Sequence, residues 1–147
     1  MPTRITNFLH DSLQTGAETI GTAFTLTAVH EHDLTAGLPD SKQAVNFRGI
    51  VEGVHIRLTA GGAPSATKLT MRICADAAGD YTLVPDTEAD LVAGLTTTTS
   101  QCVAFSVQLP LFQILSAPGN GSLYLFVKVD NAATVPTLAQ SCITWRE

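Results

Sequence analysis

The sequence predicts an all-β domain, a jelly-roll-like β-sandwich with a short N-terminal arm. Apolar residues alternate with polar ones in several short runs, which is the period of a β-strand with one buried face. Clusters of Gly, Pro, Asn and Asp separate these runs at intervals of roughly 8–15 residues, a spacing typical of sandwiches and barrels rather than of βαβ units. Eight strands in two packed sheets fit a single domain of 147 residues, and that arrangement is a jelly roll.

The first stretch of the chain differs from the rest. Its apolar residues follow helical spacing at Ile5, Phe8, Leu9 and Leu13, but the segment is short and follows Pro2. We expect either a helical turn or an arm that becomes ordered only against a neighbour. The chain is therefore divided into an arm at residues 1–15 and a β-sandwich domain at residues 16–147.

Alternation with a period of two begins after Gly16. In the first half, the strands are expected at residues 24–29, 45–59, 68–75 and 81–84, with a weaker one at 89–92. Residues 30–41 are expected to form a polar loop, and Gly49 or Gly53 to mark a bulge in the long strand. Turns are expected at residues 61–65 and 76–80. Pro85 and Asp86 are expected to interrupt the strand at residues 81–84.

The second half of the chain gives clearer strands. They are expected at residues 102–109, 123–130 and 138–146, while residues 111–115 form a short buried strand or a corner between sheets. The run from Pro118 to Ser122 is a turn, because its Asn-Gly pair readily adopts positive φ.

No formal charge occurs in the 37 residues from Leu91 to Val127. A membrane helix does not account for this gap, because polar residues and prolines break the segment well short of the roughly 20 apolar residues that a span needs. Strands and turns that face mostly protein do account for it, and part of that protein is expected to be another subunit. Its aromatic residues are the candidate subunit interface, namely Phe105, Phe112, Tyr124 and Phe126.

The second faces of several strands support the same expectation. The three cysteines, Tyr124 and Phe126 all fall on the phase opposite the main apolar stripe of their strands. A sandwich with one buried face per sheet makes that second face polar, whereas here it is small, thiol-bearing or aromatic. Either another subunit covers it, or the phase of these strands is shifted by one residue.

Composition excludes several classes of partner. A net charge of −5 and only eight Lys and Arg residues argue against direct nucleic-acid binding and against anionic membranes. The first ten residues have no continuous apolar run, so they are not a secretory signal. Three cysteines without paired spacing indicate free thiols and synthesis in a reducing cytoplasm.

No residue pattern names a reaction, so the protein is predicted to be non-enzymatic, without metal or cofactor. His30 and His32 resemble the first motif of the cupins, but no His follows His55 to complete a ligand set, and an exposed loop pair is expected. The acidic residues of one turn-rich region, Asp76, Asp80, Asp86, Glu88 and Asp90, lack the spacing of a calcium loop and are expected to be solvated. There is no GxSxG, P-loop or dinucleotide motif.

Four segments resemble the small β-domain virion proteins of tailed bacteriophages, and in particular the capsid decoration or cement proteins. They are MRICADAAGD at 71–80, VPDTEA at 84–89, GSLYLFVK at 121–128 and ITWRE at 143–147. The resemblance implies a homotrimeric jelly-roll subunit on the outer capsid surface that bridges major capsid proteins. It also implies that an N-terminal arm contacts the shell, through Ile5, Phe8, Leu9 and Leu13.

Other functions are compatible with the same residues. A head-fibre or tail component would have a sequence of the same general character. A carbohydrate-binding sandwich of the lectin type would need exposed aromatic rings, of which one Trp and two Tyr offer few. A cupin-like enzyme is disfavoured by the missing ligands.

Overall fold

The computed structural model describes residues 8–25, 30–34, 49–60, 66–91, 101–110, 113, 121–131 and 136–146. Its elements are eight β-strands. One sheet has the order β1-β8-β3-β6, made of β1 (Phe8–Thr19), β8 (Pro136–Arg146), β3 (Ile50–Ala60) and β6 (Gln101–Pro110). The other has the order β2-β7-β4-β5, made of β2 (His30–Asp33), β7 (Ser122–Val129), β4 (Lys68–Cys74) and β5 (Thr82–Asp90).

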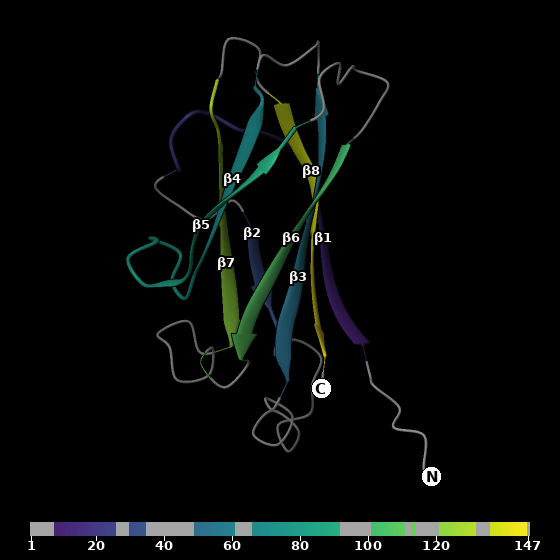
Figure 1. Ribbon diagram of the computed structural model, residues 1–147, viewed down its shortest axis with the longest axis vertical. Helices are drawn as coiled ribbons and strands as arrows, with labels where there is room; N and C mark the ends of the chain where they lie inside the picture. The colour runs from purple at the N-terminus through teal and green to yellow at the C-terminus, as the bar shows by residue number, and fades with distance from the viewer. Residues whose placement is uncertain are drawn as a thin grey trace.

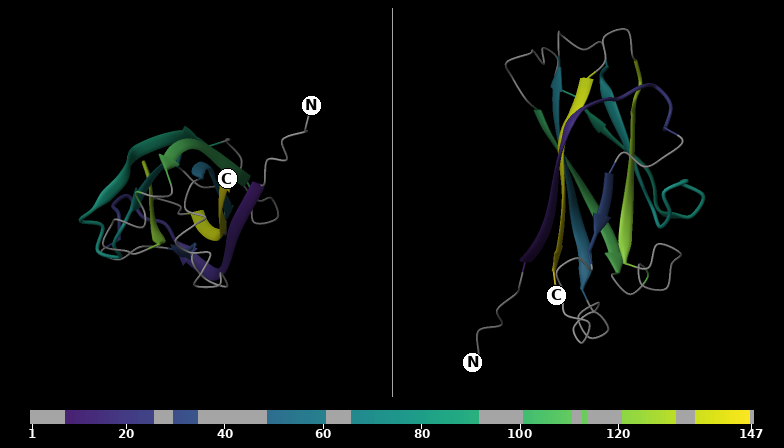
Figure 2. Two further views of the ribbon diagram at one scale, coloured as in Figure 1. Left: turned by 90° about the horizontal axis from the view of Figure 1, so that it is seen from below. Right: turned by 180° about the vertical axis from the view of Figure 1, so that it is seen from behind.

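The two antiparallel sheets face each other as a sandwich, and the chain passes repeatedly from one to the other (Figures 1 and 2). Eight strands in two four-stranded sheets with these orders form a jelly roll. The predicted fold class is therefore confirmed. We refer to the four strands β1-β8-β3-β6 as sheet A and to the four strands β2-β7-β4-β5 as sheet B.

Alternate residues of both sheets fill the space between them. On β6, Val103, Phe105, Val107 and Leu109 are buried while the residues between them are exposed. The largest fully buried apolar side chains come from both sheets, namely Ile56, Leu58, Leu69, Met71, Ile73, Leu109, Leu123, Leu125, Leu138 and Ile143. The apolar phases predicted for β4, β6 and β7 are correct, whereas on β3 Val51 is buried and Ile50 only half-buried, the reverse of the phase predicted before Gly53. The register of β3 against β6 and β8 shifts between Val51 and Gly53, which places the expected bulge at Gly53.

The N-terminal stretch is a strand where it is described. Residues 8–14 pair with β8 from Arg146 to Gln140, so β1 crosses the arm boundary expected at residue 15. The predicted helical turn is wrong here, because apolar residues near a sheet edge gain more from pairing with β8 than from an isolated short helix. Residues 1–7 lie outside the described part of the chain.

Two other strands differ from expectation. The loop expected from residue 30 begins with β2, which pairs with β7. The break expected at Pro85 lies within β5, which continues to Asp90 with irregular register against β4. Proline is tolerated there because β5 is the last strand of its sheet and one of its edges needs no ladder bonds. Parts of three expected strands lie outside the described residues, namely 26–29, 45–48 and 111–112.

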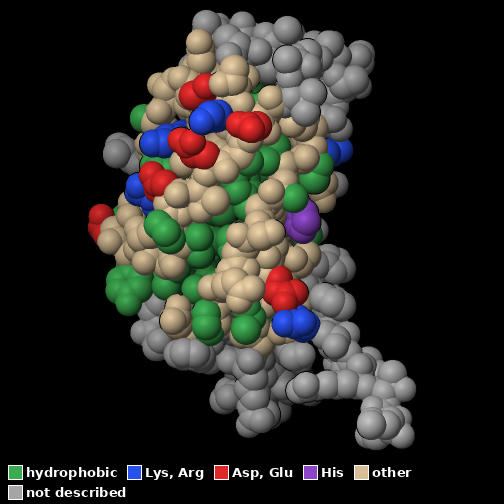
Figure 3. All heavy atoms as spheres, viewed as in Figure 1, with side chains coloured by type: hydrophobic (Ala, Val, Ile, Leu, Met, Phe, Trp, Pro, Cys, Tyr) green, Lys and Arg blue, Asp and Glu red, His purple; other side chains and the backbone are tan. Residues whose placement is uncertain are grey.

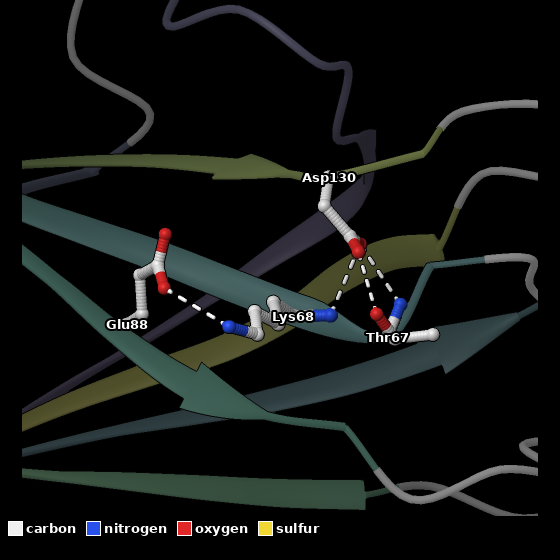
Figure 4. Close-up of polar contacts among 4 residues, drawn as sticks. All are labelled: Thr67, Lys68, Glu88 and Asp130. Atoms are coloured by element: carbon white, nitrogen blue, oxygen red, sulfur yellow. Dashed lines mark hydrogen bonds and ion pairs between the residues drawn. The ribbon is translucent and has the colours of Figure 1, made fainter.

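A carboxylate joins the end of β7 to the start of β4. Asp130 accepts hydrogen bonds from the backbone N–H of Thr67 at 2.8 Å, the Thr67 hydroxyl at 2.5 Å and the Lys68 N–H at 3.0 Å, and Lys68 Nζ lies 3.4 Å from Glu88 Oε2 (Figure 4). The Thr67 hydroxyl, followed by the Lys68 and Thr67 N–H groups, lowers the pKa of Asp130 to about 2.

Asp130→Ala is expected to lower the melting temperature at neutral pH, because three donors lose their acceptor. A carboxylate with a lowered folded-state pKa stabilises fully above its ordinary value of 3.8, and this contribution is lost as pH falls through about 2. The difference between variant and wild type should therefore shrink between pH 4 and pH 2 in thermal melts. Asp80→Ala is the matched control, and an Asp130→Ala difference that stays constant with pH would contradict the assignment.

Candidate functional site

The most unusual group of side chains lies between the sheets. His30 and His32 extend from the same face of β2 toward β8, and they are 3% and 0% exposed. Both rings reach one hydroxyl, that of Ser141. A hydrogen bond joins His30 Nδ1 to Ser141 Oγ, and another of 2.8 Å joins His32 Nε2 to the same oxygen. The two ring centroids are 6.2 Å apart.

Burial makes protonation of the His30 ring less favourable. Desolvation first, and the proximity of His32 second, lower the pKa of His30 to about 4 from its ordinary value of 6.5. The exposed loop pair expected for His30 and His32 is wrong. The sequence did contain a sign of the true arrangement, because histidines two residues apart on a strand point to the same face.

Among the described residues, no group of three or more His, Cys, Asp or Glu side chains lies close enough to hold a metal ion. Asp76, one of the turn carboxylates, instead accepts the backbone N–H groups of Asp80 and Tyr81. The part of the chain that the structure describes includes no helix with the length and hydropathy of a membrane span.

The outer face of sheet B carries an aromatic and cationic cluster. The Phe24 ring lies 4.4 Å from Arg72 Cζ and 4.6 Å from Lys128 Nζ, and it meets the Phe126 ring edge-to-face at a centroid distance of 6.3 Å. Arg72 also donates to Asp86 at 2.6 Å. Phe24 thus contacts the outer face of a sheet whose inner face is already in the core.

The turn at residues 76–80 covers the same outer face from another side. Gly79 has φ of 80°, and a Cβ placed on it would lie 3.0 Å from Phe126 Cζ, so the turn backbone sits directly on this ring. Cys74 is fully buried beneath the turn, and its thiol donates to the Gly79 carbonyl at 3.8 Å. Burial raises the pKa of this thiol. Apolar residues on the second face of β4 and β7 are therefore covered here by the chain itself.

The structure separates the four candidate interface residues. Phe105 lies in the core between the sheets and Phe126 under the Gly79 turn, at 4% and 3% exposure, so both rings are used by packing within the chain. Tyr124 is half-buried, and its hydroxyl donates a hydrogen bond of 3.2 Å to Glu31 Oε1. The Ser122 hydroxyl donates to the same oxygen at 2.9 Å. Phe112 is outside the described residues.

The four candidate capsid contacts belong to the start of the chain. Ile5 is outside the described residues. Phe8, Leu9 and Leu13 are backbone positions of β1, opposite Arg146, Trp145 and Ser141 in the register with β8. The strand places these three positions on sheet A rather than on a separate arm.

The outer-face residues of β6 itself carry no charge, whereas Arg57 of the neighbouring β3 is exposed opposite Cys102. Cys102, Ala104, Ser106 and Gln108 are the exposed residues of this ten-residue strand. In the view of Figure 3, charged side chains gather over β4 and β5, whereas the diagonal that follows β6 is nearly free of them. β6 is the last strand of sheet A, and β5 is the last strand of sheet B on the same side of the sandwich.

Comparison with known proteins gives similarity of fold only. No model of a known protein family matches the sequence, and no curated protein matches it. A chain of infectious bursal disease virus, Gx strain, is 10% identical, with a TM-score of 0.50 over 95% of this chain and 32% of that chain. The Tobacco streak virus coat protein is 10% identical, with a TM-score of 0.40 over 96% of this chain and 86% of that one. At such identity, the likeness to the infectious bursal disease virus chain shows that the two proteins share a fold.

Proposed function

We propose that this protein is a non-enzymatic structural component of a virus particle that associates with copies of itself. The observation that carries the proposal is β6, a long edge strand without a charge. A jelly roll is a fold used for viral capsids, and the solved structures that resemble this chain include ones described as a coat protein and as virus-derived T=1 particles. A self-associating surface is what such a role requires.

The two neighbouring edges of the sandwich are built differently. β5 carries Pro85, three acidic residues and ion pairs to β4, which are the usual means of preventing edge-to-edge pairing. β6 has a proline only at its last position and no charge in ten residues. An exposed uncharged edge in a folded protein favours a partner, and interface cores are depleted of charge in the same way.

In its finer form, the proposal is a homotrimeric capsid decoration or cement protein of a tailed bacteriophage. It would sit on the outer capsid surface and bridge major capsid proteins, with Ile5, Phe8, Leu9 and Leu13 adding shell contacts. This form rests on the resemblance of the segments at 71–80, 84–89, 121–128 and 143–147. Mass spectrometry of purified virions with copy-number determination tests it, since a cement protein is present in a fixed ratio to the major capsid protein.

Ser106→Asp is expected to dissociate the oligomer without unfolding the chain. Ser106 is exposed on β6, so the new carboxylate is solvated in a single chain and loses its water only when a partner covers it. Native mass spectrometry at micromolar concentration should then find monomers of the variant and trimers of the wild type. Ala77→Asp, which adds the same charge to an exposed turn, should leave the oligomer intact.

Cys102 reports on the same surface. Its thiol is exposed in the isolated chain, whereas Cys74 is buried and Cys142 is half-buried. In the assembled wild type, Cys102 should react slowly with a thiol reagent, and in Ser106→Asp it should react at once. A wild type that is monomeric, with Cys102 fully reactive, would overturn the proposal.

A further inference from the structure

The His30–Ser141–His32 cluster is a polar bridge between the two sheets. Both rings come from β2 in sheet B, and the hydroxyl comes from β8, the strand between β1 and β3 in sheet A. The nearby residues that share this interior are apolar, including Leu123 and Leu125 on β7 and Leu138 and Ile143 on β8. An imidazole in such surroundings is tolerated when it is neutral and hydrogen-bonded.

The bridge holds only a limited number of protons. A serine hydroxyl has a single hydrogen to donate and accepts further hydrogen bonds on its oxygen. With both rings neutral, Ser141 donates to one ring and accepts the N–H of the other. If the ring that accepts the hydroxyl hydrogen is protonated on its bridging nitrogen, two N–H donors face the one Ser141 oxygen. The hydroxyl hydrogen then loses its acceptor. A proton on the far nitrogen of the other ring places a charge in the core.

The charged and titratable groups around the bridge are distributed unevenly. On β2 itself, Glu31 and Asp33 alternate with the two rings and are exposed on the other face. Among the described side chains of β7 and β8, those on the inner face of the sandwich carry no formal charge. On β1, Asp11 stands opposite Ile143 and His10 opposite Thr144 in the register, and Glu18 stands opposite Leu138. Burial raises the pKa of Glu18, so this carboxyl is itself more easily neutralised by acid.

β2 is the element best able to respond to a proton. Within the described residues it has four residues, it is one of the two edge strands of sheet B, and its described pairing is with β7. Short edge strands open with less free energy than central ones. When β2 moves away from β8, both rings reach water, and the pKa of His30 returns to its ordinary value of 6.5.

We propose that the His30–Ser141–His32 bridge is an acid-sensitive latch that holds β2 against sheet A at neutral pH and releases it at mildly acidic pH. The release is local, because β3 pairs with β6 and with β8 independently of β2. The inference holds whether or not the protein is a virion component.

The sign and size of the effect follow from proton linkage. The pKa of His30 is about 4 when the latch is closed and 6.5 when the ring is solvated, so the open state binds more protons between these values. The opening equilibrium of β2 should increase by roughly 20-fold from pH 7 to pH 5 for the His30 proton alone.

Hydrogen exchange of the full-length wild type tests the latch directly. Protection factors for the segment 30–34, corrected for the intrinsic pH dependence of exchange, should fall by roughly 20-fold between pH 7 and pH 5. Protection in β3 and β8 should change little over the same range. If β2 and these central strands lose protection together, or if none of them does, the latch is refuted.

Two variants separate titration from packing. In His30→Gln/His32→Gln, the amides can still bond to Ser141 but do not titrate, so the protection of residues 30–34 should no longer depend on pH. His55→Gln is the matched control, because it removes a half-buried imidazole from β3 outside the cluster and should keep the wild-type response. A double variant that still loses protection at pH 5 as the wild type does would also overturn the proposal.

Discussion

Phe105→Asp is expected to prevent folding of the chain, whereas Ser106→Asp, one residue further along β6, is expected to leave it folded. Phe105 is 4% exposed and stands opposite Val54 within the core. An ionised carboxylate there has no partner and costs several kcal/mol, in addition to the packing lost with the ring. The sum is comparable with the whole free energy of unfolding of a domain, about 5–15 kcal/mol.

Circular dichroism and urea titration of the two variants check this expectation. The Phe105→Asp chain should lack a cooperative transition, and the Ser106→Asp chain should show one close to that of the wild type. The comparison is informative because both variants carry the same new charge in the same strand. A cooperative, near-native Phe105→Asp protein would mean that Phe105 does not face the core.

Phe126→Ala is expected to lower the free energy of unfolding by about 3–5 kcal/mol, the usual cost of removing a buried aromatic ring. Phe126 is 3% exposed between the edge of the Phe24 ring and the Gly79 turn, so its removal leaves a cavity on the outer face of sheet B. Tyr81→Ala is the control, because Tyr81 is 50% exposed and its loss should change stability by no more than about 0.5 kcal/mol.

Urea denaturation of the two variants gives these values directly. The same experiment distinguishes the two explanations of an apolar residue on this second face. If Phe126→Ala dissociates the oligomer but leaves the stability of the single chain unchanged, Phe126 belongs to a subunit interface and not to the internal packing seen here.

The period of two predicted which residues share a face, but it did not predict what covers that face. Leu69, Met71 and Ile73 lie in the core as their alternation indicated. Phe126 lies on the opposite face, also as indicated, yet the cover comes from Phe24 and Gly79, about 100 and 47 residues earlier in the sequence. Contacts over such separations depend on the topology of the whole sandwich, and alternation within one strand holds no information about them.

The histidine cluster was missed for a related reason. Polar residues are mostly found outside, so His30 and His32 suggested a loop. Their burial depends on Ser141, more than 100 residues later, which supplies the hydrogen bonds that make it tolerable. The hydrogen bonds of Asp130 likewise come from distant residues, because its three donors belong to Thr67 and Lys68, more than 60 residues earlier.

The position of β8 restricts how this protein is made. β8 is the last strand in the sequence, yet it lies inside sheet A and supplies the hydrogen bonds that join β1 to β3. While the ribosome is still translating residues 136–146, β1 has no partner in its sheet and β3 has only β6. The sandwich therefore closes only after residues 136–146 have left the ribosome, and until then β1 and β3 have unpaired edges that can pair with other chains.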